Sequence, residues 1–327
     1  MRVTRADIKG VVGIVPTPAT HDAASWRASN TIHIGQTVKM IEAVAAAGVD
    51  IIMTTGTFGE CATLTWEELR EFVGCVVDTT RKRCPVFAGV TTLNTRDTIT
   101  RGRALIDTGA DGLFVGRPMW LPLDGQAIVR YYRDVAEALP GIPLVVYDNP
   151  APFKGKISTE VYRQLVAIPE VVASKHTGGP ALEQDLQAVG DQIALLPLET
   201  DWCEIAKKFP DRTPACWSGN VACAPTPVVA LSRAIQKRDW ATAERISEQV
   251  NWAIKPMMLG DFARFMSYSI QVGHARFRGA GLIDPGPPRP PYTDAPADCI
   301  AGGEETGRRW AQLEKEYAAK SREPFPG

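Results

Sequence analysis

Short apolar runs recur along the first two thirds of the chain, and polar or turn-forming residues bound each of them. The eight runs are GVVGIVP (10–16), VDIIMTT (49–55), CPVFAGV (84–90), DGLFVG (111–116), IPLVVYD (142–148), EVVASK (170–175), IALLPL (193–198) and TPACWSG (213–219). Runs of this length and composition are typical of parallel β-strands that are buried on both faces.

Amphipathic segments separate the runs, and the clearest cover residues 37–48, 65–81 and 127–139. Thr65 followed by Glu68 has the spacing of a capping box, which marks a helix start. Eight alternating strand–helix units predict a (β/α)8 TIM barrel in preference to an open doubly wound sheet.

Strand signals stop after about residue 225. Residues 240–254, the segment that follows up to Phe277, and residues 306–320 have helical patterns. The proline-rich stretch 283–296 cannot form a regular element, because proline interrupts both helices and ladders. We therefore expect a barrel with a short N-terminal lead over residues 1–225 and a helical C-terminal extension packed on it over residues 226–327.

Charge is nearly balanced, with 36 Lys and Arg against 37 Asp and Glu, so no nucleic-acid partner is expected. No apolar run reaches the ~18 residues of a membrane span, and MRVTRADIKG at the N-terminus lacks the apolar stretch of a signal peptide. We expect a cytoplasmic protein without a membrane partner.

The seven cysteines, without a C-x-x-C pair, predict reduced thiols, and the small number of histidines, four, argues against a zinc or iron site.

In a TIM barrel, catalytic side chains come from the carboxyl ends of the strands and from the loops after them. Lys175 ends the sixth apolar run and Tyr147 is the last residue but one of the fifth, so we expect them at the ends of neighbouring strands. A lysine amine is a nucleophile only when neutral, and burial lowers its pKa, which suits Schiff-base formation with a carbonyl. A nearby tyrosine can transfer the protons. Either residue alone is more often structural, so the prediction depends on the pair.

Three short motifs follow the predicted strands two, five and six. They are Gly-Thr-x-Gly-Glu at 56–60, Tyr-x-Asn-Pro at 147–150 and the strand-end Lys175. Together they resemble the dihydrodipicolinate synthase / N-acetylneuraminate lyase superfamily over roughly residues 7 to 295. The resemblance implies a class I, pyruvate-handling aldolase with Lys175 as the Schiff-base lysine and Tyr147 as the acid/base. It also implies that Thr57 and its loop amides bind the pyruvate carboxylate, and that the protein is a homotetramer.

Within the superfamily, residues 56–69, PMW (118–120) and RPPY (289–292) look most like the hydratase-aldolases of aromatic degradation. These enzymes cleave ortho-substituted benzylidenepyruvates to an aromatic aldehyde and pyruvate, with a covalent Schiff base and no metal or organic cofactor. Phe58 and Trp120 replace a threonine and a tyrosine of the synthase pattern. Both changes add aromatic surface, which favours a flat aryl substrate over a semialdehyde or a sugar.

The remaining site candidates surround the Lys–Tyr pair. The substrate-binding candidates are Gly56, Thr57, Phe58, Trp120, Asn149 and Trp217. Both tryptophans have packing as the alternative explanation. Arg117 is a cation that could meet an ortho carboxylate, or else a structural ion-pair residue. His176 alternates away from Lys175 along the strand, so we expect it to face the helices.

The ortho substituent stays open between carboxylate and hydroxyl. Similarity in VVYDNP (145–150) and KHTGG (175–179) leans towards the family members that act on 2'-carboxybenzalpyruvate and release 2-carboxybenzaldehyde. The alternative is trans-o-hydroxybenzylidenepyruvate, which gives salicylaldehyde. An aldolase for a keto-deoxy sugar acid is disfavoured by Phe58 and Trp120. A catalytically silent ligand sensor is disfavoured by the intact Lys–Tyr pair, and a metal-dependent aldolase by the few histidines.

Overall fold

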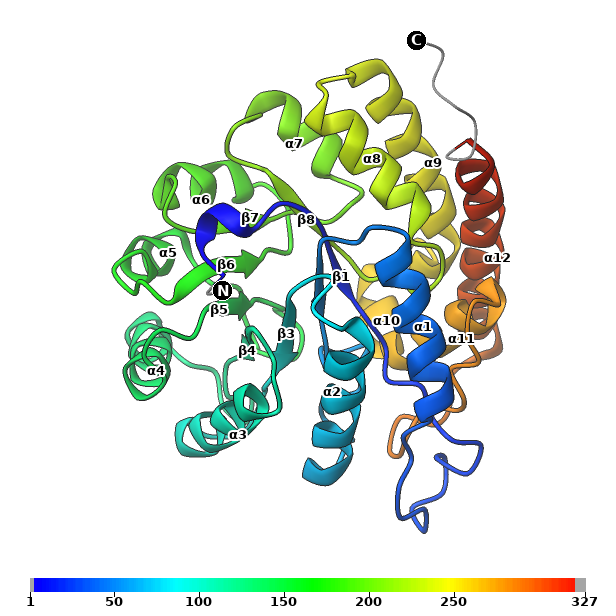
Figure 1. The fold of residues 1–327 in the computed structure, drawn as a ribbon, viewed down its shortest axis with the longest axis horizontal. Coiled ribbons are helices and arrows are strands. Elements are labelled where there is room, and N and C mark those ends of the chain that lie inside the picture. The colour runs from blue at the N-terminus through cyan, green and yellow to red at the C-terminus, as the bar shows by residue number, and fades with distance from the viewer. Residues whose placement is uncertain (1–2, 321–327) are drawn as a thin grey trace.

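The computed structural model describes residues 3–320 and shows a barrel of eight parallel strands, each followed by a helix (Figure 1). The strands are β1 (Gly10–Ile14), β2 (Ile51–Met53), β3 (Val86–Gly89), β4 (Gly112–Gly116), β5 (Leu144–Tyr147), β6 (Val171–Lys175), β7 (Ala194–Leu196) and β8 (Ala215–Ser218). Their order is β7-β6-β5-β4-β3-β2-β1-β8, and an isolated parallel bridge between Leu198 and Trp217 closes the barrel. The predicted barrel is confirmed, and each strand lies inside its predicted apolar run.

The barrel helices alternate with the strands and cover the outside of the barrel. They are α1 (Ile34–Ala46), α2 (Trp66–Thr80), α3 (Thr95–Asp107), α4 (Gly125–Ala138), α5 (Thr159–Leu165), α6 (Leu182–Val189), α7 (Trp202–Lys208) and α8 (Thr226–Gln236). At the start of α2, the Thr65 hydroxyl accepts from the Glu68 amide and the Glu68 carboxylate accepts from the Thr65 amide. The predicted capping box is therefore confirmed.

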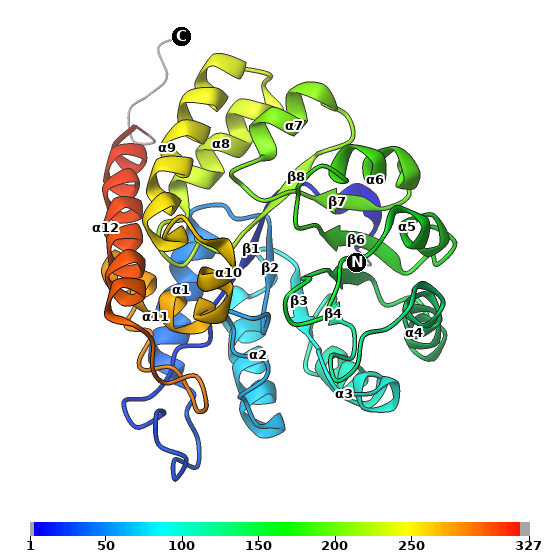
Figure 2. The same cartoon turned by 180° about the vertical axis from the view of Figure 1, so that it is seen from behind.

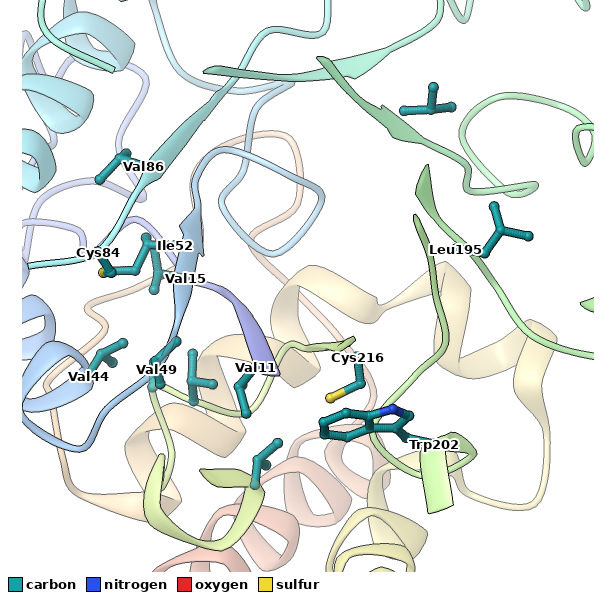
Figure 3. Close-up of a cluster of buried hydrophobic side chains, with 14 of the residues drawn as sticks. Val11, Val15, Val44, Val49, Ile52, Cys84, Val86, Leu195, Trp202 and Cys216 are labelled. Atoms are coloured by element: carbon teal, nitrogen blue, oxygen red, sulfur yellow. The ribbon is translucent and has the colours of Figure 1, made fainter. Parts of the chain in front are cut away.

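Alternate side chains of each strand point into the barrel and out to the helices. In β1, Val12 belongs to the inner apolar cluster and Val11 to the outer one. Figure 3 shows part of the outer cluster, in which Val11 and Ile52 of the strands lie near Val44 of α1. Because both faces are buried, the strands read as continuous apolar runs rather than as alternating ones.

The C-terminal helices lie together on one side of the barrel (Figure 2). They are α9 (Trp240–Met258), α10 (Phe262–Ser267), α11 (Ser269–Ala280) and α12 (Ala297–Lys320), and residues 283–296 contain neither helix nor strand, as predicted. Helix α12 packs against α8, α9 and α11. In chain order α8 completes the eighth strand–helix unit, and the domain division at residue 225 stays a prediction. No helix within residues 3–320 has the length and apolar character needed to span a membrane.

Helix α12 begins at Ala297, well before the predicted start at residue 306, so that boundary was wrong. Glycines in its first half weaken the helical signal, because glycine is a poor helix former. Their function is close packing: a Cβ on Gly303 would lie 2.7 Å from the Val272 carbonyl oxygen, and one on Gly307 only 2.0 Å from that of Arg276. The backbones of α12 and α11 therefore pack directly against each other.

Candidate active site

Lys175 and Tyr147 face each other at the carboxyl ends of β6 and β5. Their Cα atoms are register partners in the parallel strand pair. Lys175 follows the inward-facing Ala173 by two positions, so it also points into the barrel. Its Nζ lies 5.1 Å from the centroid of the Tyr147 ring and 3.7 Å from that of Trp217. The structure thus brings together the pair that the sequence placed on neighbouring strands.

The Lys175 amine is held in a dry environment. Its side chain is 5 % exposed, and it forms no salt bridge with any carboxylate in the described chain. Burial lowers the pKa of Lys175 to about 7, although the charges of Asp148 and Glu199 act in the opposite direction. A neutral amine is therefore abundant near neutral pH, which is the state required for attack on a carbonyl.

The Tyr147 hydroxyl is the centre of a small polar network. It shares a 2.6 Å hydrogen bond with the Thr57 hydroxyl, and the Thr57 amide donates to it at 3.3 Å. The Asn149 side-chain amide also donates to it, at 3.1 Å. Burial raises the pKa of Tyr147, while the bonds from Thr57 and Asn149 oppose this shift. The phenol therefore keeps its proton at neutral pH and can exchange it through hydroxyl groups.

The loop that carries Thr57 is fixed by the C-terminal segment. Glu60, at the end of the loop, has φ of 54°, a left-handed conformation that is uncommon outside glycine. Its carboxylate forms a buried ion pair with Arg289, accepts the Arg289 amide at 2.8 Å, and lies 3.1 Å from the His274 Nε2. Arg289 of the RPPY motif, which lies in the C-terminal segment, therefore supports the loop that carries Thr57.

A pocket of about 710 Å³ opens above the Lys–Tyr pair. Helices α9, α10 and α11 supply much of its wall. Apolar side chains dominate that wall, among them Phe58, Trp217, Met257, Met258, Phe265 and Met266. Lys255 and Arg276 also line the pocket, and no Asp or Glu of the described chain does so. The pocket is therefore suited to a flat, apolar and anionic molecule.

Most predicted binding residues are found at this pocket. Thr57, Phe58, Asn149 and Trp217 line it together with Lys175 and Tyr147. Gly56 lies behind them: a Cβ there would be 3.3 Å from the Phe114 ring and 3.9 Å from the Tyr147 ring. The absence of a side chain at residue 56 leaves these two rings their space.

Trp120 and Arg117 do not line the pocket. The Trp120 side chain is 75 % exposed, so the expected substrate contact finds no support within one chain, because the loop after β4 turns this ring to solvent. Arg117 is buried, pairs with Asp148 at 3.1 Å through Nη1 and donates from Nη2 to the Gly155 carbonyl, so both terminal nitrogens already have partners. It is the structural ion-pair residue, and as a candidate for a substrate carboxylate it was wrong.

His176 faces the helices, as predicted. Its Nε2 lies 2.9 Å from Asp185 of α6, its Nδ1 accepts the Gly178 amide, and Trp217 donates to its carbonyl. Within residues 3–320, no three His, Cys, Asp or Glu side chains gather closely enough to hold a metal ion. The seven cysteines are all free thiols.

The sequence interpretation missed the wall built by residues 251–276. Its signal was two apolar clusters, MML (257–259) at the end of the long helix α9 and FARFM (262–266) just beyond it. Arg276 was also missed, because nothing in its local sequence separates a buried arginine from a surface one.

Comparisons with known proteins agree with this geometry. Residues 17–293 match the Dihydrodipicolinate synthetase family. The chain is 50 % identical, over 98 % of both chains, to the trans-2'-carboxybenzalpyruvate hydratase-aldolase of Nocardioides sp. (strain KP7). It is 41 % identical, over 97 % of both chains, to the trans-O-hydroxybenzylidenepyruvate hydratase-aldolase of Pseudomonas putida.

A solved structure described as PhdJ bound to substrate intermediate superposes with a TM-score of 0.95 at 52 % identity, covering 97 % of this chain and 99 % of that chain. The match extends over the barrel and over the C-terminal helices alike. The chain belongs to the dihydrodipicolinate synthetase family.

Proposed function

We propose that this protein is a class I hydratase-aldolase that converts 2'-carboxybenzalpyruvate and water to 2-carboxybenzaldehyde and pyruvate. The observation that carries the proposal is the buried Lys175 amine beside Tyr147 at the floor of a largely apolar pocket. The 50 % identity to the Nocardioides enzyme supports the choice of substrate.

The first half of the reaction builds an electron sink. The Lys175 amine attacks the 2-keto carbon and, after loss of water, forms an iminium that is conjugated with the side-chain double bond. Thr57 and the amides of its loop hold the pyruvoyl carboxylate. A water molecule adds at the benzylic carbon, and the enamine that results takes a proton at the adjacent carbon.

The second half breaks the carbon–carbon bond. Tyr147 gives its proton to the hydroxyl that leaves as water when the iminium forms, and the resulting phenolate then accepts the proton of the new hydroxyl group. The bond between the two side-chain carbons breaks, with its electrons moving into the iminium. The aldehyde leaves, and the enamine of pyruvate is protonated and hydrolysed to free Lys175. The Schiff base supplies the whole electron sink, so these steps need no metal or organic cofactor.

A carboxylate substituent fits the charge of the pocket better than a neutral one. Two cations, Lys255 and Arg276, line the pocket in addition to Lys175, without any acidic lining residue in the described chain. The apolar wall argues against a polyhydroxylated sugar acid, because burying unpaired hydroxyls is unfavourable. The homotetramer and the cytoplasmic location remain predictions.

A substrate panel tests the proposal. The panel contains 2'-carboxybenzalpyruvate, its 2'-hydroxy analogue, the unsubstituted benzylidenepyruvate and a keto-deoxy sugar acid, with pyruvate release as the readout. We expect the highest kcat/KM with the 2'-carboxy compound and no pyruvate from the sugar acid. Cleavage of the sugar acid without activity on any arylidene compound would refute the proposal.

The pKa of Lys175 predicts the pH dependence of catalysis. Because the neutral amine exists above about pH 7, kcat/KM should level off above this value and fall about tenfold per pH unit below it. Tyr147, whose pKa burial raises, should add no further limb in the neutral range. The measurement is kcat/KM from pH 5 to 9 under matched ionic strength. A limb centred near pH 10 would mean that Lys175 is not desolvated in solution.

A further inference from the structure

Arg276 of α11 is a buried cation in the wall of the pocket. Its side chain is 1 % exposed, and the residue lines the cavity that also holds Lys175. The guanidinium carbon lies 4.3 Å from the centroid of the Phe58 ring and 4.7 Å from that of Phe277. These contacts fix the plane of the group between two aromatic rings.

Only one edge of this guanidinium is hydrogen-bonded to protein oxygen. Nη1 donates to the Asn220 side-chain oxygen at 2.8 Å and lies 3.8 Å from the Met257 sulfur. Nε and Nη2 are buried and have no hydrogen-bond partner within the described chain. In a planar guanidinium these two nitrogens lie on one edge, and their N–H groups point in parallel. This arrangement binds a carboxylate through two hydrogen bonds.

The other two buried arginines differ from Arg276, because both have a carboxylate partner. Arg117 pairs with Asp148, and Arg289 pairs with Glu60. Burying a charge without a counter-charge is strongly unfavourable, so a buried cation without a partner is unusual unless a ligand supplies the anion.

The nearest acid does not fill this role. Glu199 reaches Arg276 only through Asn220, whose side chain donates to the Glu199 carboxylate at 2.6 Å. Burial also raises the pKa of Glu199, which favours its neutral form. Lys255, the other extra cation at the pocket, is exposed, so water screens its charge.

We propose that the free Nε–Nη2 edge of Arg276 binds the carboxylate on the aryl ring of the substrate and thereby selects a carboxy-substituted ring over a hydroxy-substituted or unsubstituted one. The proposal rests on the proposed function and assigns the recognition of the second substrate anion to one residue. Selection follows because an unsubstituted ring leaves the two buried donors unpaired, and a site built for a polar group discriminates strongly against substrates that lack it.

Kinetics of Arg276→Met with the three benzylidenepyruvates test this proposal. The variant should lose roughly 100-fold in kcat/KM with the 2'-carboxy substrate, because a buried charge pair is removed. It should change by less than about threefold with the unsubstituted one, because that substrate makes no such pair. Arg276→Lys keeps the charge without the planar fork and should show an intermediate loss. Arg278→Met is the matched control, because Arg278 lies on the same helix, is exposed and does not line the pocket. It should leave the ratio between the two substrates within about threefold of wild type.

An equal loss with all three substrates would overturn the proposal, because Arg276 would then be structural or would bind the pyruvoyl carboxylate that they share. If Arg276→Met does not fold, the test is inhibition of the wild-type enzyme by 2-carboxybenzaldehyde and by benzaldehyde. Stronger inhibition by the carboxy compound supports the proposal, and equal inhibition overturns it. A wild-type enzyme that cleaves none of the three would refute the proposed function itself, and the assignment of Arg276 with it.

Discussion

Replacing Lys175 by methionine is expected to lower turnover of the arylidene substrate by about 10,000-fold or more, because the covalent intermediate can no longer form. Methionine keeps most of the side-chain volume, and the site around it is apolar, so the fold should be retained.

Burial of the Lys175 amine depresses its pKa, so the folded state binds fewer protons than the unfolded one between about pH 7 and pH 10. The free energy of unfolding of the wild type should therefore decrease as the pH falls from about 10 to about 7. The methionine variant lacks this dependence and should be the more stable protein at pH 7.

Borohydride reduction in the presence of pyruvate locates the intermediate directly. The wild type should lose activity irreversibly, and peptide mapping should find the adduct on Lys175. Lys255→Met, which removes the other lysine of the pocket, should still carry the adduct on Lys175. An adduct on another lysine would contradict the mechanism.

Tyr147→Phe is expected to lower kcat by about 100- to 10,000-fold, the usual range for loss of a positioned acid/base. The hydroxyl removed is the one that contacts Thr57 and Asn149, while the ring contacts with Phe114 and Phe153 remain possible. Stopped-flow turnover together with thermal unfolding separates lost chemistry from lost structure. Unchanged turnover would make Tyr147 a packing residue only.

Tyr162→Phe is the matched control. Tyr162 is equally buried, but its hydroxyl bonds to Ser174 on the helix-facing side of β6 and does not reach the pocket. Loss of this hydrogen bond should lower the free energy of unfolding by about 1 kcal/mol and leave turnover unchanged. A large fall in turnover for this variant would show that any buried tyrosine hydroxyl of the barrel affects the reaction.

The barrel and the juxtaposition of Lys175 and Tyr147 could be predicted from sequence for a simple reason. Strands buried on both faces give continuous apolar runs, and consecutive strands of a barrel are neighbours. The order of the runs therefore placed Tyr147 beside Lys175, and the period of two placed both inside and His176 outside. These inferences need only local patterns and chain order.

The wall of the pocket needed information that local patterns do not contain. An apolar helix face shows that a helix is packed against something, but it does not show where the helix docks. Helix α11 is buried along most of its length, so its sequence has no polar stripe to mark a solvent side. Whether Arg276 is paired, and whether Trp120 turns inward, depends on residues distant in the chain.

The contact of α12 with the backbone of α11 has an evolutionary consequence. The groups proposed to perform the chemistry stand on β5 and β6, whereas α9, α10 and α11 build much of the pocket wall, and α12 packs against α9 and α11. On the proposed mechanism, reaction type and substrate preference are determined by separate stretches of the sequence. We therefore expect that exchanging the region after residue 240 between family members changes the preferred substrate and preserves the aldol chemistry.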